Sequence, residues 1–180
     1  GYVSTDLMLL GEEDGIRDAI EKSLQKSHQH LVNGGTSVEA VQIAINILED
    51  SPYFNAGKGS VFTSSGTNEL DASIMNGQNG QAGAVAGLTN IKNPIDAAIA
   101  VMDHSPHVFL IGEGAEEFAV THGIDTVPQS YFFNEYRYQE HLEGLSENKT
   151  KFGTVGAVAI DRNGNIAAGT STGGMNNKRF

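Results

Sequence analysis

Cysteine is missing from this sequence, basic residues are few, and no long apolar run occurs. Without cysteine the chain has no disulfide, no thiolate metal site and no cysteine nucleophile. The 11 Lys and Arg are outnumbered by 22 Asp and Glu, which gives a net charge of −11. This acidity argues against binding to nucleic acid or to an anionic membrane surface, because both need a basic face. A bilayer span needs about 20 apolar residues, so we expect no membrane partner.

The start of the chain also lacks a targeting signal. Residues 1–4 (Gly-Tyr-Val-Ser) have neither the basic nor the apolar region of a signal peptide. Because the absence of cysteine also suits a reducing compartment, we expect a cytoplasmic protein. The length of 180 residues is enough for one domain with a substantial core. The 22 glycines predict many tight turns and close backbone contacts.

The first part of the chain predicts two packed helices. Residues 12–33 place apolar side chains at helical spacing, and a Gly-Gly pair ends the segment. Thr36 and Glu39 form a capping-box pattern for a second helix over residues 37–50. That helix is apolar on nearly all sides, which predicts that it is deeply buried.

The rest of the chain mixes short strands with helices. We expect strands at 61–62, 69–75, 82–88, 108–111, 155–160 and 165–172, and helices at 94–104 and 113–122. Residues 124–152 are polar and aromatic, and we interpret them as a long, partly disordered connection. The last two strands are joined by Asp-Arg-Asn-Gly, in which Asn-Gly is a strong hairpin signal.

Two threonines flank this last hairpin. Thr154 precedes one strand and Thr172 ends its antiparallel neighbour, so we expect their hydroxyl groups to be adjacent. Threonine is common in strands, and such a pair is usually structural. A threonine at a loop-to-strand boundary becomes a nucleophile when the peptide bond before it breaks, because the freed α-amine can act as the base for the hydroxyl. The pattern alone leaves both roles open.

A series of motifs accompanies these threonines in a fixed order. The chain contains Asn-Ala-Gly-x-Gly at 55–59, Glu-Leu-Asp-Ala-Ser-Ile-Met at 69–75, Ala-Gly-Ala-Val-Ala-Gly at 82–87, Asn-Pro-Ile at 93–95, Ser-Pro-His-Val at 105–108, Gly-Glu-Gly-Ala-Glu at 112–116, Gly-Thr-Val-Gly-Ala-Val at 153–158 and Thr-Ser-Thr-Gly-Gly at 170–174. Each motif is weak alone, but the ordered set is specific. The chain resembles the plant-type (type III) asparaginase and isoaspartyl peptidase family of N-terminal-nucleophile hydrolases.

The resemblance implies a fold and an activity. The fold would be α+β, an αββα sandwich with a hairpin from 61 to 75 in one sheet and a hairpin from 155 to 172 in the other, incomplete in this chain. The precursor would cut itself between Gly153 and Thr154. Thr154 would then attack the side-chain amide of L-asparagine or the isopeptide carbonyl of a β-aspartyl dipeptide, and hydrolysis of the acyl-enzyme ester would release L-aspartate.

The resemblance also implies roles for two further residues. Thr172 would hydrogen-bond to the Thr154 hydroxyl and orient it. Asn55 matches a family asparagine that supports the nucleophile from the other subunit, although an asparagine just before a glycine is equally typical of a turn.

The resemblance further implies subunits and an ion. Residues 1–153, with the loop 124–153, would be the α portion of a single asparaginase-like domain, and residues 154–180 would begin the β portion. An α/β heterodimer would pair into a heterotetramer. No organic cofactor is implied, but a structural sodium ion is, held by backbone carbonyls, which suit a hard cation. The matching positions are Leu48, Glu49, Ser51, Phe54, Ala56 and Lys58.

The sequence departs from the family pattern at both ends, so we expect a truncated chain. A His-Gly-Gly-Ala-Gly turn has no counterpart near the start. The substrate-binding Gly-Arg-Val-Gly-Asp segment and the Thr-Gly pair of the oxyanion hole would lie beyond Phe180, and the loss of one oxyanion donor alone costs about 100- to 1000-fold in rate. Two alternatives to an active asparaginase stay open: an inactive truncated form or pseudoenzyme acting as a binding module, and a glycosylasparaginase-like or threonine endopeptidase relative.

Overall fold

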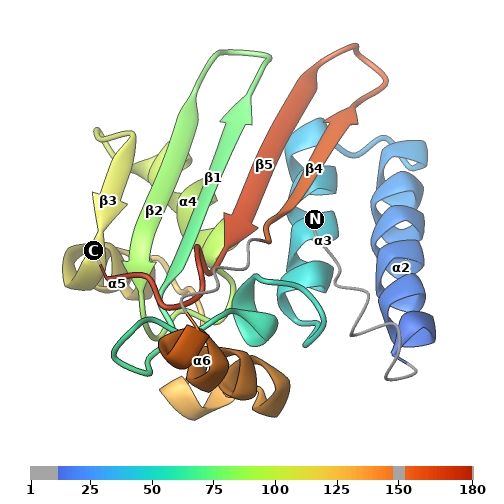
Figure 1. The fold of residues 1–180 in the computed structure, drawn as a ribbon. Helices are drawn as coiled ribbons and strands as arrows, with labels where there is room; N and C mark the ends of the chain where they lie inside the picture. The colour runs from blue at the N-terminus through green and yellow to red at the C-terminus, as the bar shows by residue number, and fades with distance from the viewer. Residues whose placement is uncertain (1–11, 148–152, 180) are drawn as a thin grey trace.

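The computed structural model describes residues 12–147 and 153–179. A single sheet is packed against helices, and one further helix lies across an end of the sheet (Figure 1). The elements in chain order are α2 (Glu13–Val32), α3 (Ser37–Glu49), the 3-10 helix η1 (Gly57–Gly59), β1 (Leu70–Asn76), β2 (Ala82–Leu88), α4 (Pro94–His104), β3 (Phe109–Ile111), α5 (Gly112–Thr121), the 3-10 helix η2 (Gln129–Tyr131), α6 (Glu135–Glu147), β4 (Val155–Ile160) and β5 (Ile166–Thr172).

Helices α2 and α3 pack against each other, and α3 in turn packs on strands β4 and β5 (Figure 1). The predicted capping box begins α3. The Glu39 backbone N–H donates to the Thr36 hydroxyl (3.3 Å), and the Thr36 backbone N–H donates to the Glu39 carboxylate (2.8 Å). A buried hydrogen bond from the Ser23 hydroxyl to the Ala44 carbonyl oxygen (3.1 Å) joins the two helices. Both predicted helices are confirmed.

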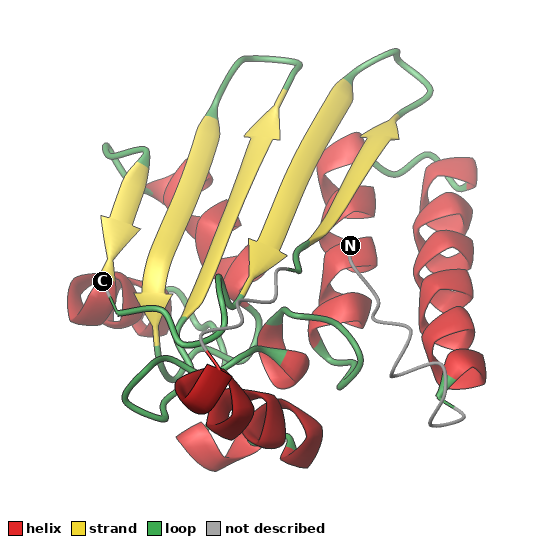
Figure 2. Ribbon diagram, in the orientation of Figure 1, coloured by secondary structure: helices red, strands yellow, loops and turns green. Residues whose placement is uncertain are grey.

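The five strands form one mixed sheet with the order β3-β2-β1-β5-β4 (Figure 2). All neighbouring strands are antiparallel except the parallel pair β2–β3. Strand β5 therefore lies between β1 and β4, with Thr172 opposite Asp71 on one side and Ser171 opposite Val155 on the other. The end of β5 and the start of β4 meet at the same end of the sheet.

Helices α3, α4 and α5 cover one face of this sheet. Residues of β1 alternate as predicted: Leu70, Ala72 and Ile74 are buried under the helices, while Ser73 and Met75 are exposed on the opposite face. The core lies between the helices and the sheet and includes the fully buried Ile45, Leu70, Leu88, Ile95 and Val101. The helical layer and sheet confirm the α+β class and are consistent with an αββα sandwich.

A buried acid joins the end of α3 to the start of α4. The Ile95 backbone N–H donates to Glu49 Oε1 (3.0 Å), and the Asn93 amide donates to Glu49 Oε2 (3.2 Å). Because its side chain is fully buried, desolvation raises the pKa of Glu49 to about 8. These hydrogen bonds thus link the end of α3 to the start of α4, two segments far apart in the sequence.

Helix α6 corrects the interpretation of residues 124–152 as a partly disordered connection. This helix begins after Asn134, whose Oδ1 accepts a hydrogen bond from the Arg137 backbone N–H (3.2 Å). The short η2 helix precedes α6, and residues 148–152 lie outside the described part of the chain. Arg137, Glu140 and His141 are all buried in α6. Because the inward face is polar, the usual apolar periodicity of a helix is missing.

A second correction concerns Val61 and Phe62, which do not form a strand. The Val61 backbone N–H donates to the Asn55 side chain (2.9 Å), and the Phe62 carbonyl accepts from the Asn177 backbone N–H (2.8 Å). The expected hairpin from 61 to 75 is therefore wrong. The β4–β5 hairpin lies in the same sheet as β1, so the two-sheet assignment of these segments is also wrong for the described residues.

Candidate active site

Thr154 and Thr172 lie side by side at the end of the sheet. Strand β4 begins directly after Thr154, and the pairing of Val155 with Ser171 brings Thr154 opposite the end of β5. The Thr154 and Thr172 hydroxyl oxygens are 3.2 Å apart. The hairpin turn fixes this register, since Asp161 Oδ1 accepts hydrogen bonds from the backbone N–H groups of Asn163 (2.9 Å) and Asn165 (3.0 Å). The expected proximity of the two hydroxyl groups is confirmed.

The Gly153 carbonyl oxygen is the point on which these groups converge. It lies 2.8 Å from the Thr154 hydroxyl, 2.9 Å from the Thr172 hydroxyl and 2.8 Å from Asn55 Nδ2. Each hydroxyl has one proton to donate. If the single Thr154 proton is donated to the Thr172 hydroxyl, Thr172 and Asn55 are the two groups that donate to the carbonyl.

The Asn55 side chain is buried and has its hydrogen bonds satisfied. Its Oδ1 accepts from the Val61 backbone N–H (2.9 Å), and its Nδ2 donates to the carbonyl oxygens of Gly153 and Gly174 (2.7 Å for the latter). The bond from Val61 fixes which end of the amide is the acceptor. The structure therefore places Asn55 beside the Gly153 carbonyl, and the side chain does more than form a local turn.

Two glycines allow the turn after β5 to lie close to the Asn55 side chain. A Cβ on Gly173 would lie 2.6 Å from Asn55 Oδ1 and 2.7 Å from Ser60 Cβ. Gly174 has a φ of +76°, and its N–H donates to the Thr172 hydroxyl oxygen (3.0 Å). The glycines that follow Thr172 are therefore part of the site geometry, a role that the sequence pattern did not reveal.

Lys178 is a further residue that sequence reasoning missed. Its ammonium group donates to the carbonyl oxygens of Gly173 (3.1 Å) and Glu69 (2.9 Å). It thereby ties the turn after β5 to the segment that leads into β1. A lone lysine near the end of a chain carries no pattern that would indicate this contact.

The profile of the asparaginase family Asparaginase_2 matches residues 1–180. The chain belongs to the asparaginase family. The family assignment agrees with the order of motifs in the sequence and with the grouping of Thr154, Thr172 and Asn55 around one carbonyl.

Several curated proteins are similar to this asparaginase-family chain. It is 42% identical to an isoaspartyl peptidase of Escherichia coli over 99% of the chain and 60% of the relative. It is 43% identical to an isoaspartyl peptidase of Salmonella typhimurium, over 89% of the chain and 55% of the relative. An isoaspartyl peptidase/L-asparaginase of Bos taurus is 44% identical over 92% of the chain and 56% of its own length. The chain thus spans little more than half the length of these relatives.

The sodium positions that the resemblance implies run from the end of α3 through the following loop into η1. A Cβ on Gly57, whose φ is +51°, would lie 2.4 Å from the Glu49 carbonyl oxygen, and one on Gly59 would lie 2.2 Å from the Phe54 carbonyl oxygen. The Glu49 and Phe54 carbonyl oxygens therefore lie directly against glycines. This donor chemistry fits a hard monovalent cation.

The described part of the chain contains no helix with both the length and the apolar character that a bilayer span requires.

Proposed function

We propose that this asparaginase-family chain cleaves its own Gly153–Thr154 bond and that Thr154 then acts as the nucleophile of an amidase. The substrates would be L-asparagine and β-aspartyl dipeptides, and the product would be L-aspartate. The observation that carries this proposal is the Gly153 carbonyl oxygen, which has Asn55 Nδ2 at 2.8 Å and the Thr172 hydroxyl at 2.9 Å, beside the Thr154 hydroxyl.

Self-cleavage begins when Thr154 Oγ1 attacks the Gly153 carbonyl carbon. The Thr154 proton passes to Thr172 Oγ1, and the Thr172 proton passes to the carbonyl oxygen. Asn55 Nδ2 donates to the same oxygen and stabilises the charge that develops there. The tetrahedral intermediate collapses, the C–N bond breaks, and the proton returns to the nitrogen. The resulting ester between Gly153 and Thr154 is hydrolysed by water, which frees the Gly153 carboxylate and the Thr154 hydroxyl and α-amine.

The freed α-amine gives Thr154 its own base. An α-amino group has an ordinary pKa of about 8, so a useful fraction is neutral near pH 7. The amine accepts the hydroxyl proton while Oγ1 attacks the side-chain carbonyl of the substrate. Ammonia, or the second amino acid of a β-aspartyl dipeptide, leaves with that proton, and water then hydrolyses the acyl-enzyme ester. Thr172, 3.2 Å from Oγ1, orients the nucleophile.

The choice of substrate rests on the relatives. Those from Escherichia coli and Bos taurus are named isoaspartyl peptidase and isoaspartyl peptidase/L-asparaginase. These names favour asparagine and β-aspartyl dipeptides over the glycosylasparaginase-like and endopeptidase alternatives. The described residues give no support to an inactive relative, because Thr154, Thr172 and Asn55 are all present and surround the Gly153 carbonyl oxygen. Since the chain spans little more than half of these relatives, the activity is proposed for the whole protein.

Further properties of the whole protein follow from the same proposal. Residues 1–153 and the portion that starts at Thr154 would stay associated as an α/β heterodimer, and two heterodimers would pair in the cytoplasm.

The carbonyl groups of Leu48, Glu49, Ser51, Phe54, Ala56 and Lys58 would hold a sodium ion that stiffens the loop containing Asn55. Replacement of sodium by choline should then lower the melting temperature, and an unchanged melting temperature would count against the ion.

The activity is tested by ammonia release from L-asparagine and by dipeptide hydrolysis, with the protein at its natural length. We expect turnover of both substrates by the processed protein and none by a Thr154→Ala variant. Thr172→Val, which keeps the shape but lacks the hydroxyl, should lower the rate by about 100- to 1000-fold, the typical effect of losing one such group. A processed, folded protein with no activity on either substrate would refute the assignment.

A further inference from the structure

Helix α6 contacts both loops that shape the site. We propose that Arg137 on α6 is a positioning residue for self-cleavage, acting through Asn55. The inference rests on the proposed self-cleavage and assigns a function to a helix that lies just before the scissile bond in the chain. Figure 1 shows α6 across the end of the sheet at which β5 ends and β4 begins.

The start of α6 holds the loop that contains Asn55. Asn134 Nδ2 donates to the Pro52 carbonyl oxygen (3.1 Å). Arg137 donates through Nη2 to the Tyr53 carbonyl oxygen (3.4 Å) and through Nε to the Gly59 carbonyl oxygen (3.1 Å). These contacts lie on both sides of Asn55 in the sequence, so they fix the position of its side-chain amide.

The Arg137 guanidinium is itself held in place. Its side chain is only 8% exposed, and Nη1 donates to Glu140 Oε2 at 2.8 Å. The planar group thus points its nitrogens at three different acceptors at once. A lysine ammonium on a flexible stem cannot reproduce this fixed fork.

The same helix also holds the segment after β5. Asn176 Nδ2 donates to the Glu140 carbonyl oxygen (3.0 Å), and Asn177 Nδ2 donates to the His141 carbonyl oxygen (3.0 Å). The His141 ring also contacts the Asn177 side-chain oxygen, and Asn177 adopts a φ of +60°. This segment follows directly on Gly174, the second carbonyl to which Asn55 donates.

Helix α6 therefore positions both the Asn55 amide, which donates to the Gly153 carbonyl, and the segment that follows Gly174. A hydrogen bond of 2.8 Å is lost when the two atoms separate by less than an ångström more, and a misplacement of about 1 Å in a reacting group can cost about 100-fold in rate. Release of Arg137 from the loop should shift the Asn55 amide away from the Gly153 carbonyl, although Arg137 touches neither reacting atom.

The test follows precursor processing in the protein at its natural length, by pulse-labelled cell-free translation. Arg137→Lys should slow cleavage by about 10- to 100-fold. Asn55→Ala should slow it by about 100- to 1000-fold, and Arg137→Lys added to Asn55→Ala should change the rate by less than about twofold, since both act through one bond. Equal slowing by Arg137→Lys in both backgrounds would indicate a merely structural role and would overturn the inference.

Two further measurements keep the test decisive. Asn134→Asp retains the helix cap but lacks the Nδ2 donor to Pro52, so it should slow cleavage with little loss of stability. Crystal structures of the uncleavable Thr154→Ala precursor, with and without Arg137→Lys, should differ in the distance from Asn55 Nδ2 to the Gly153 oxygen. An Asn55 amide in the same place in both would refute the inference, even if the Asn55→Ala precursor cleaves too slowly to time.

Arg17→Lys is a matched control. Arg17 forms an exposed ion pair with Glu13 on α2, so the Arg17→Lys precursor should be cleaved at an unchanged rate. The proposed function fails separately, if the unmodified precursor stays intact or if Thr154→Ala is still cleaved. The inference about Arg137 fails if the unmodified precursor cleaves at Thr154 and Arg137→Lys cleaves at the same rate.

Discussion

At the scale of single residues, one buried amide links three parts of the backbone. Asn55 accepts from Val61 and donates to the carbonyl oxygens of Gly153 and Gly174. Asparagine suits this position because its amide offers an acceptor and two donor protons in one plane. Aspartate at this position could not donate to the Gly153 carbonyl, and alanine would remove all three of these hydrogen bonds.

Substitution of Gly173 tests how closely this site is packed. Gly173→Ala places a methyl group 2.6 Å from Asn55 Oδ1 and 2.7 Å from Ser60 Cβ. We expect a loss of about 1–3 kcal/mol in the free energy of unfolding, because the neighbours must shift, together with slower processing of the precursor. Denaturant unfolding and a processing time course measure the two effects.

Gly114 provides the control for this substitution. It lies in α5, and a Cβ there meets nothing within 4 Å. Gly114→Ala should stabilise the protein by about 0.5–1 kcal/mol, because alanine is the better helix former. Equal effects of the two substitutions would contradict the close approach of Gly173 to Asn55.

Thr154 and Thr172 were easier to place from sequence than Asn55. A hairpin turn fixes the register between neighbouring strands, so the adjacency of Thr154 and Thr172 follows from local pattern alone. Asn55 and Gly153 are 98 positions apart, so no local pattern relates them. The residues around Asn55 left a turn and a catalytic support equally open, and only the family resemblance pointed to the second.

At the scale of elements, the helices that bury apolar faces were predictable and α6 was not. Helix α4 has Pro94 in its first turn and buries Ile95, Val101 and Met102, so both its start and its periodicity are visible in the sequence. Helix α6 instead buries Arg137, Glu140 and His141. A polar inward face is stabilised by specific partners that no single-sequence pattern reveals.

The capping box of α3 gives a prediction for the effect of pH. The hydrogen bond from His30, followed by those from the backbone and hydroxyl of Thr36, lowers the pKa of Glu39 from 4.5 to about 2. A depressed pKa in the folded state means that the ionised carboxylate stabilises the fold above pH 4.5 and that this contribution disappears as the pH falls towards 2.

Glu39→Gln should therefore lower stability at pH 6 and have a much smaller effect near pH 2.5. Because the Glu39 side chain is 52% exposed, we expect the free energy of unfolding to fall by only about 0.5–1 kcal/mol at pH 6. Urea unfolding of both proteins across this pH range measures the difference. A difference that stays constant or grows as the pH falls would show that the Glu39 charge does not contribute in this way.

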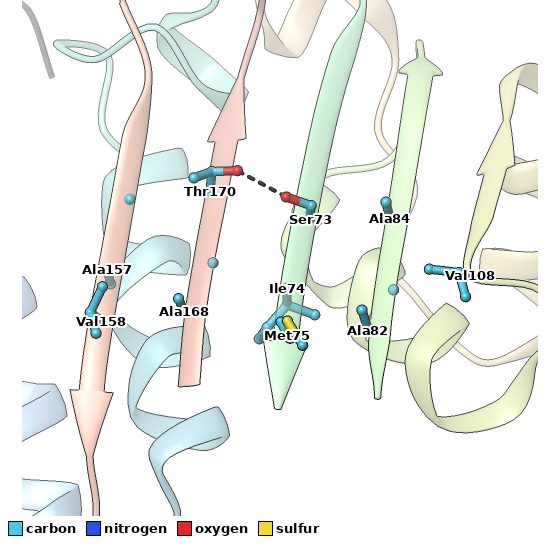
Figure 3. A pocket seen from close by; sticks show the side chains of 13 residues that line it. Ser73, Ile74, Met75, Ala82, Ala84, Val108, Ala157, Val158, Ala168 and Thr170 are labelled. Carbon is cyan, nitrogen blue, oxygen red and sulfur yellow. Dashed lines mark hydrogen bonds between the residues drawn. The ribbon is translucent and has the colours of Figure 1, made fainter. Parts of the chain in front are cut away.

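At the scale of the whole molecule, the sheet is covered on one face only in the described residues. The opposite face exposes Met75, Val158, Ile160 and Ile166, with Val158 being 75% exposed. Figure 3 shows the open groove across this face, from Val158 on β4 past the hydrogen-bonded Ser73 and Thr170 (3.0 Å) to Val108. Patches of this kind are unusual on a monomeric protein.

Residues 1–180 expressed alone should therefore self-associate through this face. Val158→Lys should shift the distribution towards smaller species, because a charge in the centre of an apolar contact is costly to bury. Val120→Lys is the control, since Val120 is also exposed (53%) but lies on α5, away from this face. Sedimentation velocity distinguishes the outcomes, and a monodisperse monomer that melts cooperatively would contradict the expectation.

The central claim is that the chain breaks before Thr154 and that Thr154 does the breaking. Intact-mass spectrometry and N-terminal sequencing of the protein at its natural length test it most directly. We predict two fragments, one ending at Gly153 and one beginning with Thr154, whose masses add up to that of the precursor plus one water molecule. A Thr154→Ala protein should remain in one piece. A wild-type chain that stays intact on prolonged incubation, or a Thr154→Ala chain that yields the same two fragments, would contradict the account.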